Sequence, residues 1–260
     1  MGQSTKVRVK IPKYSIPKRR VTPTLLKIDD LLPHEEIIHE RLNALLDMIL
    51  ELGAVDMPII AAPIPGTSKY LIVDGHHRWA ALRKLGARKV PAILINYFSP
   101  EVRVYTWYPG FKGDANEFLE LVDKAGVDVD ESNTDGEDII KSVESGECKV
   151  GERECAFIML GKNGKCFKLG GWLEGQKKVV KILDRLAGMG KLTMTWYGLL
   201  EDALKDLREN EIDYVLVRRG LTKDEVMKVV KAGKVLPPKT TRHVLPFVPE
   251  KVYTKLSLLM

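Results

Sequence analysis

The sequence has little cysteine and few side-chain amides. Its 260 residues include only three cysteines, Cys148, Cys155 and Cys166, whose odd number and spacing match neither a CxxC pair nor a zinc knuckle. We therefore expect free thiols in a reducing compartment. Six asparagines and two glutamines stand beside abundant lysine, arginine and glutamate, a bias that is typical of heat-stable proteins.

The sequence also lacks long apolar runs. No segment approaches about 18 consecutive apolar residues, the length that a membrane-spanning helix needs. The N-terminus is basic but has no apolar stretch of the kind found in signal peptides. We expect a cytoplasmic protein that does not associate with membranes.

Positive charge is concentrated in residues 1–24. This segment holds seven of the 41 basic residues and no acidic residue, which leaves 34 basic against 35 acidic residues in the rest of the chain. A Pro-punctuated basic arm is most often a solvated terminal segment, and contact with nucleic acid or another anionic surface is the alternative. Because the body of the chain is nearly neutral, nucleic acid is not the expected partner.

Helical and strand-like patterns alternate along the chain and predict an α/β protein. Apolar residues at helical spacing predict helices at residues 36–52, 76–85, 114–125, 137–145, 174–187, 199–209 and 222–232. Short apolar runs predict strands at residues 25–32, 58–62, 70–73, 90–98, 102–107, 155–160, 165–169, 191–197 and 212–218, before an extended tail at residues 237–248. We expect a basic extended arm at residues 1–24 and α/β domains at residues 25–99 and 100–260.

Two segments of the second half have unusual patterns but carry no predicted site. Residues 127–147 hold eight acidic residues and one lysine, which indicates a mobile, solvated excursion. Residues 170–177 look like a phosphate-binding P-loop, but Gln176 stands where that motif needs a lysine directly after its second glycine. We interpret them as a turn before the helix at residues 174–187.

The strongest motif is the run from Tyr70 to Gly86. A short apolar strand ends at Asp74-Gly75, and a helix begins at once. Gly75 permits a backbone bend that a side chain would block, and the first N–H groups of the helix have no partner within it. Together with the positive end of the helix dipole, these groups form an anion-binding site.

His76, His77 and Arg78 stand in the first turn of this helix. The Arg78 guanidinium can bind phosphate oxygens in a forked geometry. Asp74 would repel phosphate unless it holds a divalent cation or relays a proton, and the simpler alternative is that it caps the helix. Adjacent residues diverge by about 100° around a helix, so His76 and His77 cannot both face one metal ion.

These segments resemble the ParB/sulfiredoxin fold, whose corresponding box binds nucleotide phosphates. The resemblance rests on Pro33, Pro58-Ile-Ile and Tyr70-Leu-Ile-Val-Asp-Gly-His-His-Arg-Trp-Ala-Ala. Sulfiredoxins themselves do not fit, because their catalytic cysteine falls within the box, which here contains no cysteine. Partition proteins fit poorly, because they follow the box with a helix-turn-helix reader, whereas residues 100–260 are predicted to form an α/β domain.

The chain is more similar to the archaeal ADP-dependent free L-serine kinases, along nearly its whole length. Five ordered segments carry the similarity: Pro33 to Glu35, Tyr70 to Gly86, Val104 to Pro109 with Phe111 to Asp114, Tyr197-Gly198, and Pro238 to Phe247. The resemblance implies a ParB/sulfiredoxin-like nucleotide-binding domain at residues 25–99 and a substrate domain at residues 100–260. It places the active site in the cleft between them.

This resemblance also implies a reaction, the transfer of a phosphoryl group from ADP to free L-serine with Mg²⁺. The products would be AMP and O-phospho-L-serine, which can feed cysteine synthesis. The resemblance places the catalytic base on Glu35, an essential acid on Asp74 and a serine-binding tryptophan on Trp107. From the residues alone, Glu35 is not distinguished from Glu36 or from an exposed acid favoured by the helix dipole, and Trp107 is otherwise a core aromatic.

The tail from Lys239 to His243 offers two hydroxyls, two cations and an imidazole in five positions. In an extended chain Thr240 and Arg242 face one side, while Thr241 and His243 face the other. We interpret this segment as a clamp on the substrate carboxylate and the transferred phosphate. An ordinary polar edge strand is the alternative.

The candidate residues therefore form three groups. The candidate catalytic residues are Glu35 and Asp74, and Asp74 is also the candidate Mg²⁺ ligand, directly or through water. The candidate nucleotide-binding residues are Gly75, His76, His77, Arg78, Thr240 and Arg242, and the candidate substrate-binding residues are His34, Trp107, Lys239, Thr241 and His243. L-Serine and ADP are the expected partners, and a ParB-like nucleotide-gated DNA-binding protein or a CTP or ATP hydrolase is the alternative function.

Overall fold

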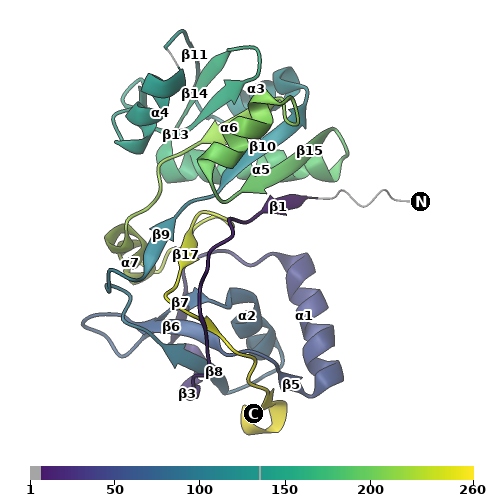
Figure 1. Cartoon of the computed structure of the whole chain (residues 1–260), viewed down its shortest axis with the longest axis vertical. Coiled ribbons are helices and arrows are strands. Elements are labelled where there is room, and N and C mark those ends of the chain that lie inside the picture. The colour runs from purple at the N-terminus through teal and green to yellow at the C-terminus, as the bar shows by residue number, and fades with distance from the viewer. Residues whose placement is uncertain (1–6, 135) are drawn as a thin grey trace. The chain divides into compact units, whose positions relative to one another are not determined.

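The computed structural model describes residues 7–134 and 136–260, which form two compact units of mixed α/β structure (Figure 1). The small-sheet unit contains Tyr14–Tyr105 and Leu221–Met260, and the large-sheet unit contains Thr106–Gly220 with the described part of Met1–Lys13. The predicted α/β class is confirmed. The unit bounds differ from the predicted domain boundaries, because the C-terminal segment belongs with the first half of the chain.

A five-stranded sheet with the order β3-β8-β6-β7-β4 forms the centre of the small-sheet unit. Its strands are β3 (Thr24–Lys27), β4 (Leu31–Pro33), β6 (Ile59–Pro63), β7 (Tyr70–Asp74) and β8 (Lys89–Leu94). Helices α1 (His39–Leu52) and α2 (His76–Lys84) share one hydrophobic core with these strands. Helix α2 thus follows directly after strand β7, as the sequence predicts.

The C-terminal segment completes the small-sheet unit by pairing with earlier strands. After α7 (Lys223–Lys231), β17 (Arg242–Val244) pairs with β9 (Arg103–Tyr105), β18 (Val248–Pro249) with β2 (Lys18–Arg19), and β19 (Thr254–Lys255) with β5 (Ala54–Val55). Leu259 is fully buried in the core of this unit. These pairings join segments far apart in the sequence and explain why no local pattern marks the boundary.

The large-sheet unit is built on a sheet with the order β1-β15-β10-β16-β13-β14-β11, and β12 pairs with β13. Its strands are β1 (Arg8–Lys10), β10 (Tyr108–Gly113), β11 (Val129–Ser132), β12 (Lys149–Val150), β13 (Arg153–Gly161), β14 (Cys166–Gly170), β15 (Leu192–Tyr197) and β16 (Tyr214–Val217). Its helices are α3 (Ala115–Lys124), α4 (Gly136–Glu144), α5 (Trp172–Gly188) and α6 (Leu200–Arg208).

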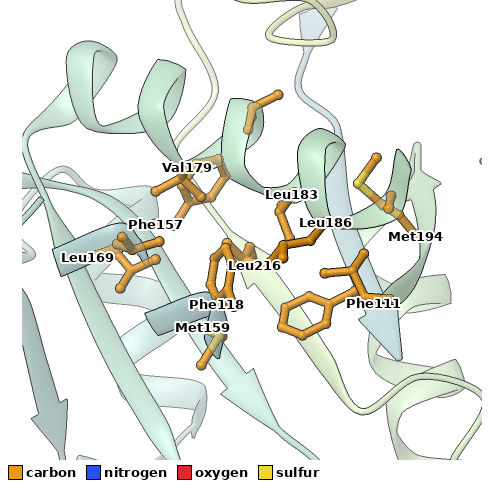
Figure 2. Packing of buried hydrophobic residues seen from close by; sticks show 14 of the residues in the cluster. Phe111, Phe118, Phe157, Met159, Leu169, Val179, Leu183, Leu186, Met194 and Leu216 are labelled. Atoms are coloured by element: carbon orange, nitrogen blue, oxygen red, sulfur yellow. The ribbon is translucent and has the colours of Figure 1, made fainter. Parts of the chain in front are cut away.

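Helix α5 carries the main core of this unit. Figure 2 shows Leu183 and Leu186 of α5 beside Phe118 of α3 and Leu216 of β16, and all four side chains are almost fully buried. Burial of apolar side chains of this size stabilises a fold by about 1.5–3 kcal/mol each. The chain bends at Gly171, between β14 and α5, but α5 begins at Trp172, so residues 172–177 are helical and not part of the predicted turn.

The basic arm is not solvated along its whole length, which corrects one expectation. Arg8–Lys10 forms strand β1 and pairs in parallel with Thr195–Tyr197. Lys10 also forms an ion pair with Asp206 at 2.5 Å, and its ammonium lies 5.5 Å from the centre of the Tyr197 ring. Lys6, which contributes to the same basic segment, lies outside the described residues.

The described residues of the acidic segment at 127–147, which are all but residue 135, are folded, and this corrects a second expectation. It contains β11 and α4, and Ile139 and Val143 of α4 are 1% and 2% exposed. These residues are four positions apart, so they lie on one face of the helix, which packs on the core while the acids face solvent. The helix predicted at residues 137–145 is therefore confirmed, and the expectation of a mobile, solvated segment is wrong.

A disulfide joins Cys148 to Cys155, which corrects the expectation of three free thiols. Cys148 directly precedes β12 and Cys155 lies in β13, and the Cys155 N–H donates to the Cys148 carbonyl at 2.9 Å. Opposite positions across a hairpin bring Cα atoms to disulfide range, and here they are 5.5 Å apart. Cys166 is free and buried, and burial raises the pKa of its thiol to about 11.

Candidate active site

The bend after strand β7 is the first element of the site. Strand β7 ends at Asp74, Gly75 has a φ angle of +93°, and α2 begins at His76. A Cβ atom at Gly75 would lie 2.8 Å from Ile59 Cγ2, so both conformation and space favour glycine here. No side chain caps the start of α2, as an anion-binding helix start requires.

Two histidines of α2 hold the loop before α1. The His34 N–H donates to His76 Nε2 at 3.4 Å, and the Ile38 N–H donates to His77 Nε2 at 3.1 Å. The adjacent imidazoles therefore bind opposite ends of the loop that carries Glu35. Among the described residues, no group of three or more His, Cys, Asp or Glu is arranged to hold a metal ion.

The same loop pairs with the C-terminal segment. The Glu36 N–H donates to the Leu236 carbonyl at 2.9 Å, and the Leu236 N–H donates to the His34 carbonyl at 2.8 Å. This short parallel bridge brings residues that are 200 positions apart in the sequence to the same place. It sets Lys239 and Thr241 against the Glu35 carboxylate.

Glu35 accepts three hydrogen bonds from these residues. The Thr241 N–H and the Thr241 hydroxyl both donate to Oε1 at 2.6 Å, and the Lys239 N–H donates to Oε2 at 3.2 Å. The side chain is 17% exposed, so the carboxylate is oriented by donors and still accessible. Since α1 begins at His39, both Glu35 and Glu36 lie on the loop before the helix, as predicted for the candidate base.

Behind Glu35 lies a group of histidines. The His34 ring has its Nδ1 2.8 Å from the Ile72 carbonyl and its Nε2 2.8 Å from the Thr241 hydroxyl. His76 Nε2 lies 3.0 Å from His34 Nδ1, and the ring of His243 is centred 5.1 Å from that of His34. His34 is only 1% exposed, so the predicted substrate-binding residue lies in the interior.

Burial keeps these imidazoles neutral at neutral pH. It is the largest cause that lowers the pKa of His34 and His77, and it lowers the pKa of His76 and His243 well below the usual histidine value. Glu35 opposes this effect at both His34 and His77. The Tyr97 hydroxyl lies 3.0 Å from His243 Nε2, a contact that no sequence motif indicated.

Arg78 has a different environment from the one predicted. Its guanidinium donates to the carbonyls of Met57 and Pro58 at 3.2 and 2.5 Å, and to Asp74 Oδ2 at 2.6 Å. These bonds brace the bend rather than leave a free fork for phosphate. Asp74 itself is 63% exposed, so its carboxylate remains accessible to a ligand at the bend.

The tail residues differ from one another in their surroundings. Thr240 is 2% exposed and donates to the Pro237 carbonyl at 2.7 Å, and the Arg242 guanidinium lies 4.8 Å from the centre of the Tyr105 ring. Lys239 is half-buried with a φ angle of +62°. Burial and then the Arg41 charge lower its pKa to about 8, against the opposing effect of Glu35.

Trp107 belongs to the large-sheet unit. It is 8% exposed and is part of the hydrophobic core there. A core position is the alternative that its aromatic side chain allows, and contact of Trp107 with serine stays a prediction.

Family comparisons define the class of protein to which this fold and site belong. Residues 7–105 match the family model described as ParB N-terminal domain, and residues 106–218 match the one described as L-serine kinase SerK, C-terminal domain. The chain thus joins a ParB-type domain to a serine-kinase C-terminal domain.

Individual relatives identify the family within that class. The chain is 46% identical over 259 residues to the ATP-dependent L-serine kinase of Staphylothermus marinus, with both chains covered completely. It is 46% identical over 248 residues to the ADP-dependent L-serine kinase SerK of Thermococcus kodakarensis, which covers 95% of this chain and 97% of that one. A solved structure of a free serine kinase in complex with AMP has a TM-score of 0.89 at 45% identity and covers 97% of this chain and all of that one. The chain belongs to the archaeal L-serine kinase family.

Proposed function

We propose that this chain phosphorylates free L-serine, with ADP as donor, and releases O-phospho-L-serine and AMP. The observation that carries the proposal is the position of the Glu35 carboxylate. Three hydrogen-bond donors orient it, and its loop is bound by two histidines of α2, the helix that follows the Gly75 bend. Phosphoryl transfer needs alignment, neutralised charge and a proton acceptor. A bend with open helix amides and an oriented carboxylate support all three requirements.

In this proposal Glu35 is the general base. It accepts the proton of the serine hydroxyl as that oxygen attacks the terminal phosphorus of ADP. A carboxylate must be accessible and correctly oriented for this role, and Glu35 is 17% exposed with both oxygens hydrogen-bonded. The family relation to L-serine kinases supports serine as the acceptor.

The nucleotide phosphates are proposed to bind at the start of α2. At the Gly75 bend no side chain caps the helix, whose first backbone N–H groups have no partner within it, and the helix dipole favours negative charge there. Arg78 contributes by bracing the loop at Met57 and Pro58 and by holding Asp74. Solved complexes of free serine kinases with AMP and ADP support a nucleotide site in this family.

Mg²⁺ fits the exposed carboxylate of Asp74. This ion usually keeps several waters and is held by one or two carboxylates together with substrate phosphates, so a single accessible acid at the bend suffices. When bound, the ion would neutralise charge on the transferred phosphoryl group. The residues of this chain orient Asp74 through Arg78 and position Glu35 through Lys239 and Thr241.

The choice of ADP over ATP as phosphoryl donor is the most specific part of the proposal. Three relatives are each 46% identical to this chain, and two of them are named for ATP and one for ADP. Adenine recognition by backbone and apolar walls leaves no motif, so ADP rests on the resemblance of the motif segments. The product, O-phospho-L-serine, is an activated precursor suited to cysteine synthesis.

Phosphorus NMR of the purified chain with serine and Mg²⁺ tests the proposal. With ADP we expect phosphoserine and AMP to form in equal amounts, and with ATP in its place we expect slower turnover. Turnover with ATP alone would contradict ADP as the donor and leave the kinase proposal intact. Absence of phosphoserine with either nucleotide would overturn the kinase proposal itself.

A further inference from the structure

The Thr241 hydroxyl lies between two acceptors that compete for its single proton. Its Oγ1 is 2.6 Å from Glu35 Oε1 and 2.8 Å from His34 Nε2. A hydroxyl carries one proton, so it donates to one of these neighbours at a time. The carboxylate oxygen accepts only, whereas the role of the imidazole nitrogen depends on its tautomer.

The surroundings of His34 fix that tautomer. Nδ1 lies 2.8 Å from the Ile72 carbonyl, which accepts only, so Nδ1 carries the proton. His76 Nε2 lies 3.0 Å from the same Nδ1 and accepts the His34 backbone N–H, which makes it a second acceptor there. In the neutral ring His34 Nε2 is therefore unprotonated and accepts from Thr241.

The neutral state of His34 agrees with its surroundings. Burial is the largest cause that lowers its pKa, and Glu35, the Ile72 carbonyl and Asp74 oppose it. The other titratable rings that face it, His76 and His243, are themselves kept neutral by burial.

We propose that the Thr241 hydroxyl is a switchable donor that sets the basicity of Glu35. It donates to Oε1 while the carboxylate is charged and rotates to His34 Nε2 when Glu35 has taken the serine proton. Thr241 and His34 are thus positioning residues for the proposed base, and this inference rests on the proposed kinase function.

The step balances without any further reactant. The serine O–H bond breaks as the Oγ–P bond forms, the proton moves to the Glu35 carboxylate, and the P–O bond of ADP breaks with its electron pair leaving on AMP. The O–H bond of Thr241 stays intact, because the group only changes acceptor. A donor to the charged carboxylate lowers its basicity, and an alternative acceptor stabilises the state in which Glu35 is neutral.

In this proposal kcat falls at low pH as Glu35 becomes protonated, and this fall is the acidic limb of the kcat–pH profile. Two variants should move this limb in opposite directions. Thr241→Val removes the donor, which destabilises the charged carboxylate and shifts the limb to higher pH by about half to one unit. His34→Asn retains an amide donor for Ile72 but removes the acceptor at the Nε2 position, so the limb shifts to lower pH and kcat falls. A purely structural role would reduce activity without shifts of opposite sign.

Conservative variants provide the matched controls. Thr241→Ser keeps the hydroxyl, and His34→Gln places a carbonyl oxygen near the Nε2 position. Both variants should therefore have the acidic limb at the same pH as the wild-type chain. Thermal unfolding checks that each variant is folded. Limbs that shift in the same direction, or stay unmoved in folded variants, overturn the proposal.

A measurement on the wild-type chain keeps the test decisive if the His34 variants do not fold. Nitrogen-15 NMR of histidine-labelled protein should show His34 as the neutral Nδ1–H tautomer at pH 7, with Nε2 unprotonated. A protonated Nε2 overturns the proposal. An inactive wild-type chain would instead overturn the kinase function and leave this tautomer unchanged, so the two failures are distinguishable.

Discussion

Lys239 combines a charged side chain with a backbone that holds Glu35. Its N–H donates to the Glu35 carboxylate, and its ammonium is half-buried beside Arg41. Because a charged amine is costly to bury near another cation, its pKa falls to about 8. A lysine of this kind loses its charge within the working range of an enzyme.

Lys239→Arg should therefore abolish the weakening of substrate binding that we expect for the wild-type chain at alkaline pH. In the wild-type chain the ammonium is charged below pH 8 and neutral above it, so KM for the anionic substrate ADP should rise as pH increases beyond about 8. Arginine stays charged throughout and should keep KM flat to about pH 10. The exposed Lys234 offers a matched Lys234→Arg control with an unchanged profile, and a wild-type KM that is flat above pH 8 would contradict the role of Lys239.

Gly75→Ala should destabilise the fold by about 1–3 kcal/mol, since the new Cβ adds a clash to an unfavourable φ. The added atom would meet Ile59 Cγ2 at 2.8 Å, and the φ angle is +93°. Gly53 is the matched control, with a φ angle of +61° but nothing within 4 Å of a new Cβ. Urea unfolding should give the smaller loss, about 1 kcal/mol, for Gly53→Ala. Equal losses would show that the space around Gly75 is not limiting.

At this scale the sequence predicts a residue better when its partners are local. The bend at Asp74-Gly75 follows from a strand, a glycine and a helix in sequence, and it is confirmed. The partners of Arg78 are carbonyls of Met57 and Pro58, which no spacing rule points to. The three donors to Glu35 belong to residues 204 and 206 positions away, so only the resemblance favoured Glu35 over Glu36.

Secondary structure was predicted well where an element buries its own apolar stripe. Each of the seven predicted helices lies within three residues of a helix in the structure. Short strands such as β1, β12 and β19 were missed, because two or three residues carry no period and are defined by their partner strand. The disulfide escaped for the same reason, since cross-strand pairing has no signature in the sequence.

The disulfide should stabilise the hairpin measurably. In the chain-entropy model, closing a loop of this length lowers the conformational entropy of the unfolded chain, which stabilises the folded state by about 2 kcal/mol. The double variant Cys148→Ser and Cys155→Ser should therefore lose about that much free energy of unfolding in urea. Reductant should lower the stability of the wild-type chain by a similar amount and leave the double variant unchanged. Insensitivity of the wild-type chain to reductant would contradict the bond.

The two units differ in how acid should affect them. All five histidines of the sequence lie within the small-sheet unit, and four of them have lowered pKa values in the folded state. Below about pH 6.5 the unfolded chain takes up protons that these folded imidazoles do not bind. Stability of this unit is therefore lost as pH falls, whereas above about pH 7.5 both states are neutral and no contribution remains.

Hydrogen exchange resolves this effect by unit. Between pH 7.5 and 5.5, after correction for intrinsic rates, protection should fall in α2 and β7 and stay nearly constant in α5 and β13. Equal losses in both units, or none in α2, would contradict the burial of neutral histidines.

Among the described residues, no helix combines the length and apolar character that crossing a membrane requires.

At the scale of the whole molecule, the α/β class could be predicted but the division of the chain could not. The helices and strands alternate clearly in both halves, whereas the return of residues 221–260 to the small-sheet unit depends on three short strand pairs. The same return supplies Lys239 and Thr241 to Glu35. Pairing over such distances in sequence leaves no local signal.

The most direct test of the account is the turnover of Glu35→Gln with ADP, serine and Mg²⁺, compared with the neighbouring control Glu36→Gln. The amide keeps the shape of the side chain but accepts no proton, so kcat should fall by about 100-fold to 10,000-fold while the affinity for ADP stays within about twofold. Glu36→Gln should retain nearly full activity. Normal turnover by Glu35→Gln, or its loss in Glu36→Gln alone, would contradict Glu35 as the base.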